Sequence, residues 1–218
     1  MGSAVWERGT LDAIRMIEYQ GLKFPEDKIK GSDAPRWLEY VKHLDVALKH
    51  VTRWKNAVDV GAHAGLYARA MAGKFQTVYA FEPSRAAYDC LILNAPQNVV
   101  SECYALGDKR HAVGLVNNKH GMVTIGESRE RAGWESYGVP GGWTQMVMLD
   151  DLHLPRVDFL KIDADGYDLG VVLGAWRLIM RDKPIVMVEQ YDKKLKVIHK
   201  YFPQTVTDYL TKSLEMKL

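Results

Sequence analysis

Short apolar runs and segments of helical spacing alternate along most of the chain. Residues 56–60 and 77–81 are apolar and rich in β-branched side chains, and a helical segment follows each of them. The order then repeats, with strands expected at 99–105, 112–116, 157–162 and 185–189, and helices at 84–94, 167–180, 193–201 and 205–213. This alternation predicts an α/β fold: a mostly parallel sheet with helices on both faces, whose ligands bind at the carboxyl ends of the strands.

Two regions stand apart from this alternation. Residues 1–50 are expected to form a helical leader packed on the core, because the apolar positions between 35 and 50 make one stripe: Trp37, Leu38, Val41, Leu44, Ala47 and Leu48. Residues 51–218 then form the main body, within one structural domain overall. Residues 120–143 are rich in glycine, and two interpretations stay open: a substrate lid, or a surface insertion or twisted hairpin.

The turn after residues 56–60 carries the first chemical signal. Gly61 and Gly65 let the backbone turn sharply towards a helix, and Glu82 ends the next strand, where a carboxylate can accept hydrogen bonds from both ribose hydroxyls. The dinucleotide fingerprint is missing, because positions 63 and 66 are histidine and leucine instead of glycine. Asp59 suits a cationic ligand better than a phosphate. The turn therefore favours S-adenosylmethionine over NAD.

Composition narrows the function classes. The 218 residues carry 29 basic and 27 acidic side chains, a net charge of +2, so a nucleic-acid partner is not expected. Cys90 and Cys103 lack metal-ligand spacing and are expected to be reduced thiols, which favours a cytoplasmic protein. No apolar run is long enough for a signal peptide or a membrane span, so no membrane partner is expected.

Five segments in order carry a more specific resemblance: DVGAHAG at 59–65, AFEP at 80–83, ALGD at 105–108, VDFLKIDADG at 157–166 and PIVMVE at 184–189. Together they resemble the FkbM family of S-adenosylmethionine-dependent methyltransferases over about residues 54–191. The resemblance implies a Rossmann-like class I methyltransferase fold. Such folds commonly close the sheet with two further strands, for which 214–218 leaves no room. Either that edge is shortened, or strands from elsewhere pair there, with 112–148 as the candidate segment.

The same resemblance assigns the cofactor-binding residues. Asp59, Gly61 and Gly65 are implied to shape the pocket for the methionine end of the cofactor, Glu82 to hold the ribose, and Asp108 to lie near the adenine. The complete expected set is Asp59, Gly61, Ala62, His63, Gly65, Glu82, Pro83, Leu106, Gly107, Asp108 and Asp163. Two positions depart from the family pattern, which has asparagine at position 63 and glutamate at position 165.

Candidate catalytic residues follow the 157–162 strand. Asp163 is the preferred base for an acceptor hydroxyl, with Asp165 and His63 as further candidates. Asp168 and Glu189 are additional carboxylates, and Asp168 equally suits helix charge compensation. Lys161 is interpreted either as an anchor of the strand end or as a group that lowers the pKa of the acceptor. Magnesium is conceivable but without support from spacing, on the carboxylates Asp150, Asp151, Asp163, Asp165 and Glu189.

The expected function is S-adenosylmethionine-dependent O-methylation of a small-molecule or carbohydrate-like acceptor, and the O-methylation part rests on the resemblance. Two alternatives stay open. One is an RNA ribose 2′-O-methyltransferase, which would use the lysines of the 193–200 segment. The other is a catalytically silent cofactor-binding subunit. A shortened sheet edge would also invite pairing with a second chain, so an oligomer is a candidate assembly.

Overall fold

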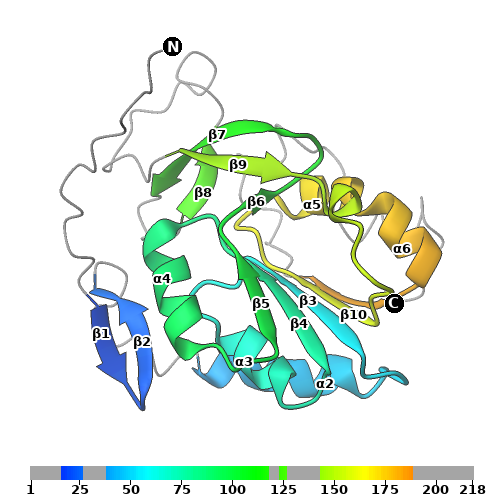
Figure 1. The fold of residues 1–218 in the computed structure, drawn as a ribbon, viewed down its shortest axis with the longest axis horizontal. Helices are drawn as coiled ribbons and strands as arrows, with labels where there is room; N and C mark the ends of the chain where they lie inside the picture. Colours follow the sequence, from blue (N-terminus) through cyan, green and yellow to red (C-terminus); the bar gives the residue numbers. More distant parts are fainter. Residues whose placement is uncertain (1–15, 27–37, 118–122, 127–142, 189–218) are drawn as a thin grey trace, which may run out of the picture.

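The computed structural model describes residues 16–26, 38–117, 123–126 and 143–188. Its centre is a five-stranded sheet in the order β11-β10-β3-β4-β5, in which every neighbouring pair is parallel (Figure 1). The strands are β3 (Asn56–Val60), β4 (Thr77–Phe81), β5 (Val99–Glu102), β10 (Phe159–Ile162) and β11 (Ile185–Val188). The predicted α/β fold with a parallel sheet is confirmed.

Helices cover both faces of this sheet, because the central strands bury apolar side chains on each face. Ala57, Val78 and Phe159 pack with residues of α2 (Leu44–Leu48), α3 (Leu66–Ala72) and α4 (Arg85–Asn94). Val58 and Leu160 point to the opposite face and pack with α5 (Asp168–Gly174) and α6 (Trp176–Asp182). The carboxyl ends of the strands therefore lie between two packed helical layers.

A second, four-stranded sheet follows β5 along the chain. Its order is β6-β9-β7-β8, with β6 (Ala105–Leu106), β7 (His111–Asn117), β8 (Val123–Gly126) and β9 (Trp143–Val147). The single strand expected at 99–105 is thus wrong, because the chain leaves the first sheet after Glu102 and joins the second at Ala105. Among the described residues of 112–148, the strands β7, β8 and β9 pair with β6 and with one another, and none of them pairs with β11.

The helix expected at 167–180 is also wrong as a single element, because it breaks at Ala175 into α5 and α6. A Cβ on Gly174 would stand only 1.8 Å from the carbonyl oxygen of Gly107, so α5 ends in close contact with that loop. The short 3-10 helix η3 (Leu149–Leu152) supplies Asp150, which accepts hydrogen bonds from the backbone N–H groups of Arg177 and Leu178, each at 2.8 Å. These two bonds satisfy free N–H groups in the first turn of α6 and so stabilise the start of that helix.

The leader is only partly helical. Residues 16–25 form the hairpin of β1 (Met16–Tyr19) and β2 (Leu22–Pro25), so the helical expectation is wrong for them. Asn94 fastens the hairpin: its side chain bonds the backbone N–H and carbonyl of Lys23, and also the carbonyl of Ala64 at 2.7 Å. The helical expectation holds for the 3-10 helix η2 (Val41–His43) and for α2, whose Leu44 and Leu48 pack on the sheet as expected.

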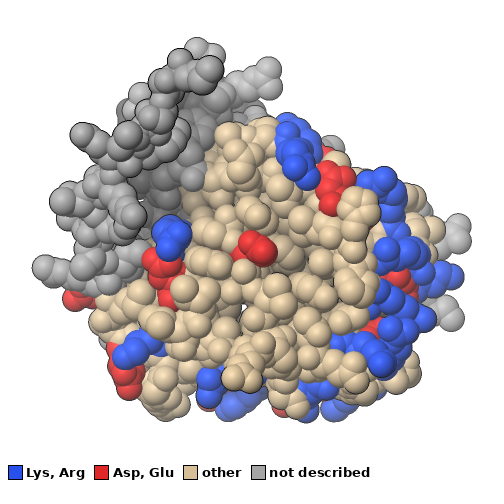
Figure 2. Space-filling model, in the orientation of Figure 1, with Lys and Arg blue, Asp and Glu red and all other residues tan. Residues whose placement is uncertain are grey.

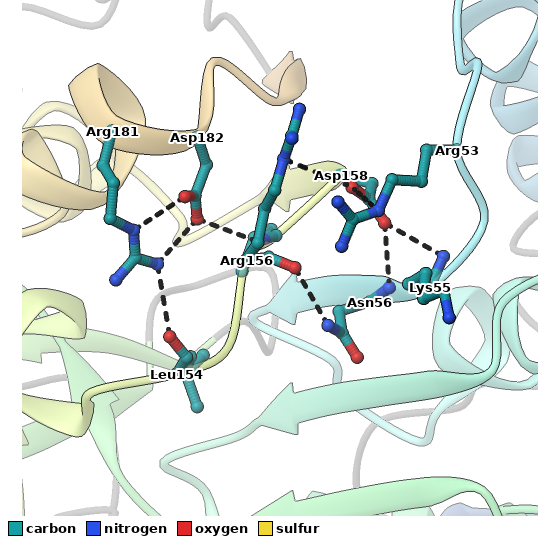
Figure 3. A network of polar contacts seen from close by, with 9 residues as sticks. Arg53, Lys55, Asn56, Leu154, Arg156, Asp158, Arg181 and Asp182 are labelled. Carbon is teal, nitrogen blue, oxygen red and sulfur yellow. Dashed lines mark hydrogen bonds and ion pairs between the residues drawn. The ribbon is translucent and has the colours of Figure 1, made fainter.

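Polar side chains close the amino-terminal edge of the sheet (Figure 3). Asp158 accepts hydrogen bonds from the backbone N–H groups of Lys55 and Asn56, and Arg53 pairs with it at 3.2 Å. Asp182, paired with Arg181, accepts the N–H of Val157 at 2.8 Å.

In Figure 2, basic side chains gather over the α6 side of the molecule. The carboxylates are buried while Arg156 and Arg181 remain over half exposed, so the outer surface is basic.

Candidate active site

A tight turn joins β3 to α3 at the carboxyl edge of the sheet. The carbonyl oxygen of Phe81, the last residue of β4, accepts hydrogen bonds from the N–H groups of both Gly61 and Ala62 at 3.0 Å. Gly61 has a φ of +68°, and a Cβ there would stand 1.8 Å from the carbonyl oxygen of Asp163. Only glycine fits this conformation and this approach. The turn therefore brings the ends of β3, β4 and β10 together.

A buried ion pair supports the turn from inside. The parallel register places Lys161 of β10 beside Asp59 of β3, and the Lys161 Nζ lies 3.0 Å from Asp59 Oδ1. The side chains are 3% and 0% exposed. Lys161 also donates to the carbonyls of Val60 and Gly61, at 3.2 and 2.9 Å, and lies over the ring of Tyr67. Asp59 is thus placed beneath the turn, with its charge compensated by Lys161.

The charge states of this pair follow from its surroundings. Burial alone would lower the pKa of Lys161, but the carboxylates of Asp59 and Asp163 outweigh it and raise that pKa well above the usual lysine value. Lys161 is therefore a permanent cation. Burial raises the pKa of Asp59, opposed by the adjacent ammonium. We assign the pair as ionised, because an ammonium 3.0 Å away favours the charged form of the carboxyl group.

Glu82 follows β4 and is held by two backbone donors. Its Oε2 accepts the N–H of His63 and its Oε1 accepts the N–H of Ser84, both at 2.8 Å. The residue is 5% exposed, and this burial is the main cause that raises the pKa of Glu82 to about 7. Each oxygen keeps a second lone pair. The carboxylate is therefore fixed in position and still able to accept two hydroxyl donors.

The loop after β10 carries the remaining acidic candidates. Asp163 is about one-third exposed, and its Oδ2 lies 3.6 Å from the Lys161 Nζ. Asp165 has a φ of +48°, and its negative charge contributes to the raised pKa of Glu82. Asp168 is buried and accepts the N–H groups of Ala164 and Gly166 at 2.8 and 3.2 Å. Asp168 thereby shapes the loop that presents the other two carboxylates.

Asp108 lies on the neighbouring loop, after β6. Leu106 and Gly107 before it are buried, and Leu106 packs in the same cluster as Phe81. The hydroxyl of Tyr167 donates a hydrogen bond to Asp108 Oδ1 at 2.9 Å. The loops after β6 and β10 therefore meet, although their residues lie about 59 positions apart in the sequence.

Most of the residues singled out from the sequence lie at the carboxyl ends of three neighbouring strands. Asp59 belongs to β3 and Lys161 to β10, and the other residues lie in the loops that follow: Gly61, Ala62, His63 and Gly65 after β3, Glu82 and Pro83 after β4, and Asp163 and Asp165 after β10. His63 has a φ of +48° and contributes its backbone N–H to Glu82. The sequence did not predict that the backbone N–H of His63 would bind Glu82. It did not single out Tyr167 either, because the contact of Tyr167 with Asp108 joins residues far apart in the sequence.

The remaining residues singled out from the sequence lie away from these strand ends or outside the described part of the chain. Asp150 and Asp151 lie in η3 and engage Arg177 instead of joining Asp163. Within the described residues, no group of three or more histidine, cysteine, aspartate or glutamate side chains is arranged to hold a metal ion. Glu189, the 193–201 and 205–213 helices, most of the 120–143 loop and the C-terminal edge lie outside the described residues. None of the described helices is both long and apolar enough to cross a membrane.

Comparisons with known proteins found a matching family and similar solved structures. The model of the methyltransferase FkbM domain matches residues 59–211. A methyltransferase FkbM from Methylobacillus flagellatus KT is similar in structure, with 19% identity and a TM-score of 0.49 over 73% of this chain and 38% of that one, so this chain spans well under half of that protein. Precorrin 8w decarboxylase from Methanobacterium thermoautotrophicum is similar with 15% identity and a TM-score of 0.45, over 82% and 72%.

No curated protein matches the sequence significantly. The family match alone spans more than half of the chain, and it includes the turn after β3, Glu82, Asp108 and the loop after β10. The chain belongs to the FkbM methyltransferase family.

Proposed function

We propose that the protein is an S-adenosylmethionine-dependent methyltransferase that acts on a hydroxyl of a small-molecule or carbohydrate-like acceptor. The observation that carries the proposal is the position of Glu82, a buried carboxylate fixed by two backbone donors beside the turn after β3. A carboxylate at the end of this strand suits the two hydroxyls of a ribose. The hydroxyl specificity rests on the available carboxylate chemistry and on the family.

The residues present fit this cofactor. Glu82 would accept the ribose hydroxyls, the turn at Gly61 and Gly65 would enclose the methionine end, and Asp108 would lie at the base. Asp59 would act indirectly, because it is enclosed and compensated by Lys161. S-Adenosylmethionine supplies a methyl group already activated on a sulfonium, so the protein mainly has to align the acceptor and manage one proton.

Asp163 is the preferred proton acceptor. It is the most exposed member of the Asp59, Lys161 and Asp163 group, and its Oδ2 lies 3.6 Å from the Lys161 Nζ. In this role a carboxylate oxygen of Asp163 would take the proton of the acceptor hydroxyl, while the cofactor, when bound, would supply the methyl group and leave as S-adenosylhomocysteine. Lys161 then acts as a positioning residue, because it is buried and bonded to backbone carbonyls. This burial also argues against an RNA 2′-O-methyltransferase that relies on Lys161.

The first test is calorimetric titration with S-adenosylmethionine and S-adenosylhomocysteine. Glu82→Ala is compared with Glu102→Ala, a matched control at the end of the adjacent strand whose side chain is exposed. Micromolar binding by the intact protein and the control, lost in Glu82→Ala, would support the cofactor assignment. Absence of binding by the intact protein would contradict it.

The second test uses labelled S-adenosylmethionine with a panel of sugars and glycans. Asp163→Asn is expected to slow transfer by about 100-fold if Asp163 is the base. If Asp163 instead holds the methionine end, the same variant will lose affinity for S-adenosylhomocysteine. Binding without transfer to any acceptor would favour a silent subunit.

A further inference from the structure

The ring of Tyr167 occupies a slot made by two glycines. A Cβ on Gly170 would stand 2.4 Å from Cε1 of Tyr167, and a Cβ on Gly107 would stand 2.8 Å from the same atom. Any larger residue at either position would displace the ring. Tyr167 also packs against the cluster of Ala105, Val113 and Met146. The ring is therefore held by close packing on several sides.

This packing gives the hydroxyl a defined direction. It donates to Asp108 Oδ1 at 2.9 Å, and Asp108 is partly exposed. In the part of the chain that the structure describes, the tyrosine is the hydrogen-bond donor to this carboxylate. A hydrogen bond to one oxygen restricts the rotation of the carboxylate and leaves the other oxygen, Oδ2, as an acceptor for a ligand.

The position of this pair relates it to the candidate cofactor site. Tyr167 comes from the loop after β10, and Asp108 from the chain beyond β5, so their bond joins loops that flank the ends of β3 and β4. Leu106 and Leu169 pack in the same cluster as Phe81, which directly precedes Glu82. In the proposed function, a ribose at Glu82 would have its base directed along this edge towards the loop of Asp108.

We infer that Tyr167 is a positioning residue that orients Asp108 to accept a hydrogen bond from the 6-amino group of a purine, and so makes the site selective for adenine. The inference rests on the proposed function. A 6-amino group donates a hydrogen bond, whereas a 6-oxo group only accepts and is repelled by a carboxylate. An oriented carboxylate discriminates more strongly than a freely rotating one, because its acceptor is already aimed.

The test compares S-adenosylhomocysteine with S-inosylhomocysteine, which has a 6-oxo group in place of the 6-amino group and a hydrogen on N1. Wild-type protein is expected to prefer the adenine form by about 100-fold. Tyr167→Phe keeps the ring in its slot and removes the hydroxyl, and it is expected to lower this preference by about tenfold. Tyr88→Phe is the matched control, because its hydroxyl donates to the Ser101 carbonyl instead. The control is expected to keep the wild-type preference.

Asp108→Asn provides a second variant with an intact tyrosine. Its amide can donate to a 6-oxo group, so the preference for the adenine form is expected to shrink, and adding Tyr167→Phe should change it little further. A wild-type preference retained in Tyr167→Phe would overturn the inference while leaving the proposed function intact. Failure of the wild-type protein to bind S-adenosylhomocysteine would overturn both.

Discussion

Lys161 and Asp59 face each other across neighbouring parallel strands, with Nζ 3.0 Å from Oδ1 and both side chains almost wholly buried. The pair is more than an attraction between two charges. The same ammonium holds the carbonyls of Val60 and Gly61, so it ties the last residue of β3 to the first residue of the turn. A buried cation with four oxygen neighbours fixes the backbone where the candidate site begins.

Lys161→Met is expected to destabilise the fold by about 3–5 kcal/mol, because it leaves the Asp59 carboxylate buried without its counter-charge. Asp59→Asn combined with Lys161→Met should recover a large part of this loss, because the uncompensated charge is then absent. Urea denaturation of the wild type, both single variants and the double variant measures the coupling. Additive effects of the two substitutions would contradict the assignment of an ionised pair.

The raised pKa of Glu82, caused mainly by burial, makes stability depend on pH. The value is about 7 in the folded protein, against 4.5 for the unperturbed group. The folded state therefore retains a proton that the unfolded state has lost, and stability decreases as the pH rises from about 4.5 to about 7. The decrease attributable to Glu82 is at most about 3 kcal/mol. Thermal melts of wild type and Glu82→Gln across this range measure it, and parallel curves would contradict the shift.

The same titration predicts the opposite slope for cofactor binding. Ribose hydroxyls donate to the ionised form of Glu82, so affinity for S-adenosylhomocysteine should rise as the pH passes through about 7. Calorimetry at pH 6 and pH 8 checks this expectation. Glu82→Gln should bind weakly at both values, and an unchanged pH dependence in that variant would assign the effect to another group.

Gly61→Ala is expected to abolish cofactor binding and to destabilise the fold by more than about 2 kcal/mol. The added Cβ would clash with the Asp163 carbonyl at 1.8 Å, in a backbone conformation of positive φ that disfavours alanine. Gly73→Ala is the matched control, because its nearest neighbour would be the Ala70 carbonyl at an ordinary 3.6 Å. Circular dichroism melts and calorimetry on both variants give the result; equal behaviour would refute the close approach.

Asp158→Ala is expected to lower the stability of the fold without changing the affinity for the cofactor. Asp158 satisfies the backbone N–H groups of Lys55 and Asn56 at the amino-terminal edge, opposite the candidate site. Its loss leaves these partly buried donors without their carboxylate partner and is expected to cost about 1–3 kcal/mol. Affinity for S-adenosylhomocysteine at 10 °C, where the variant is still folded, should remain within about twofold of wild type. A large loss of affinity would mean that the two edges are coupled.

The sequence was most informative where one local pattern determines the structure. The apolar runs of β3 and β4, with Gly61 and Glu82 after them, predicted the strands within a residue and placed their ends at one edge. The hairpin at 16–25 was missed although the sequence carries a signal, a glycine at position 21 with strand-like residues on either side. In the structure Gln20 and Gly21 both have positive φ, the backbone of a tight two-residue hairpin turn.

Other features depend on contacts distant in sequence. The Lys161 pair with Asp59 follows from the strand register, which neither segment specifies alone. The break at Ala175 follows from the close approach of Gly174 to Gly107. The segment 99–106 forms two strands because β5 pairs in the first sheet and β6 in the second. Local periodicity carries no information about such partners, so Tyr167 and its bond to Asp108 required the structure.

The attachment of the β1–β2 hairpin to Asn94 also bears on the order of synthesis. Lys23 leaves the ribosome 71 residues before its partner, which corresponds to about 4–14 s of translation. A lone two-stranded hairpin is at best marginally stable, so Leu22 and Phe24 have no lasting burial during this interval. The hairpin can therefore dock only after α4 has been synthesised and has folded. The first described segment of the chain is thus among the later ones to adopt its final packing.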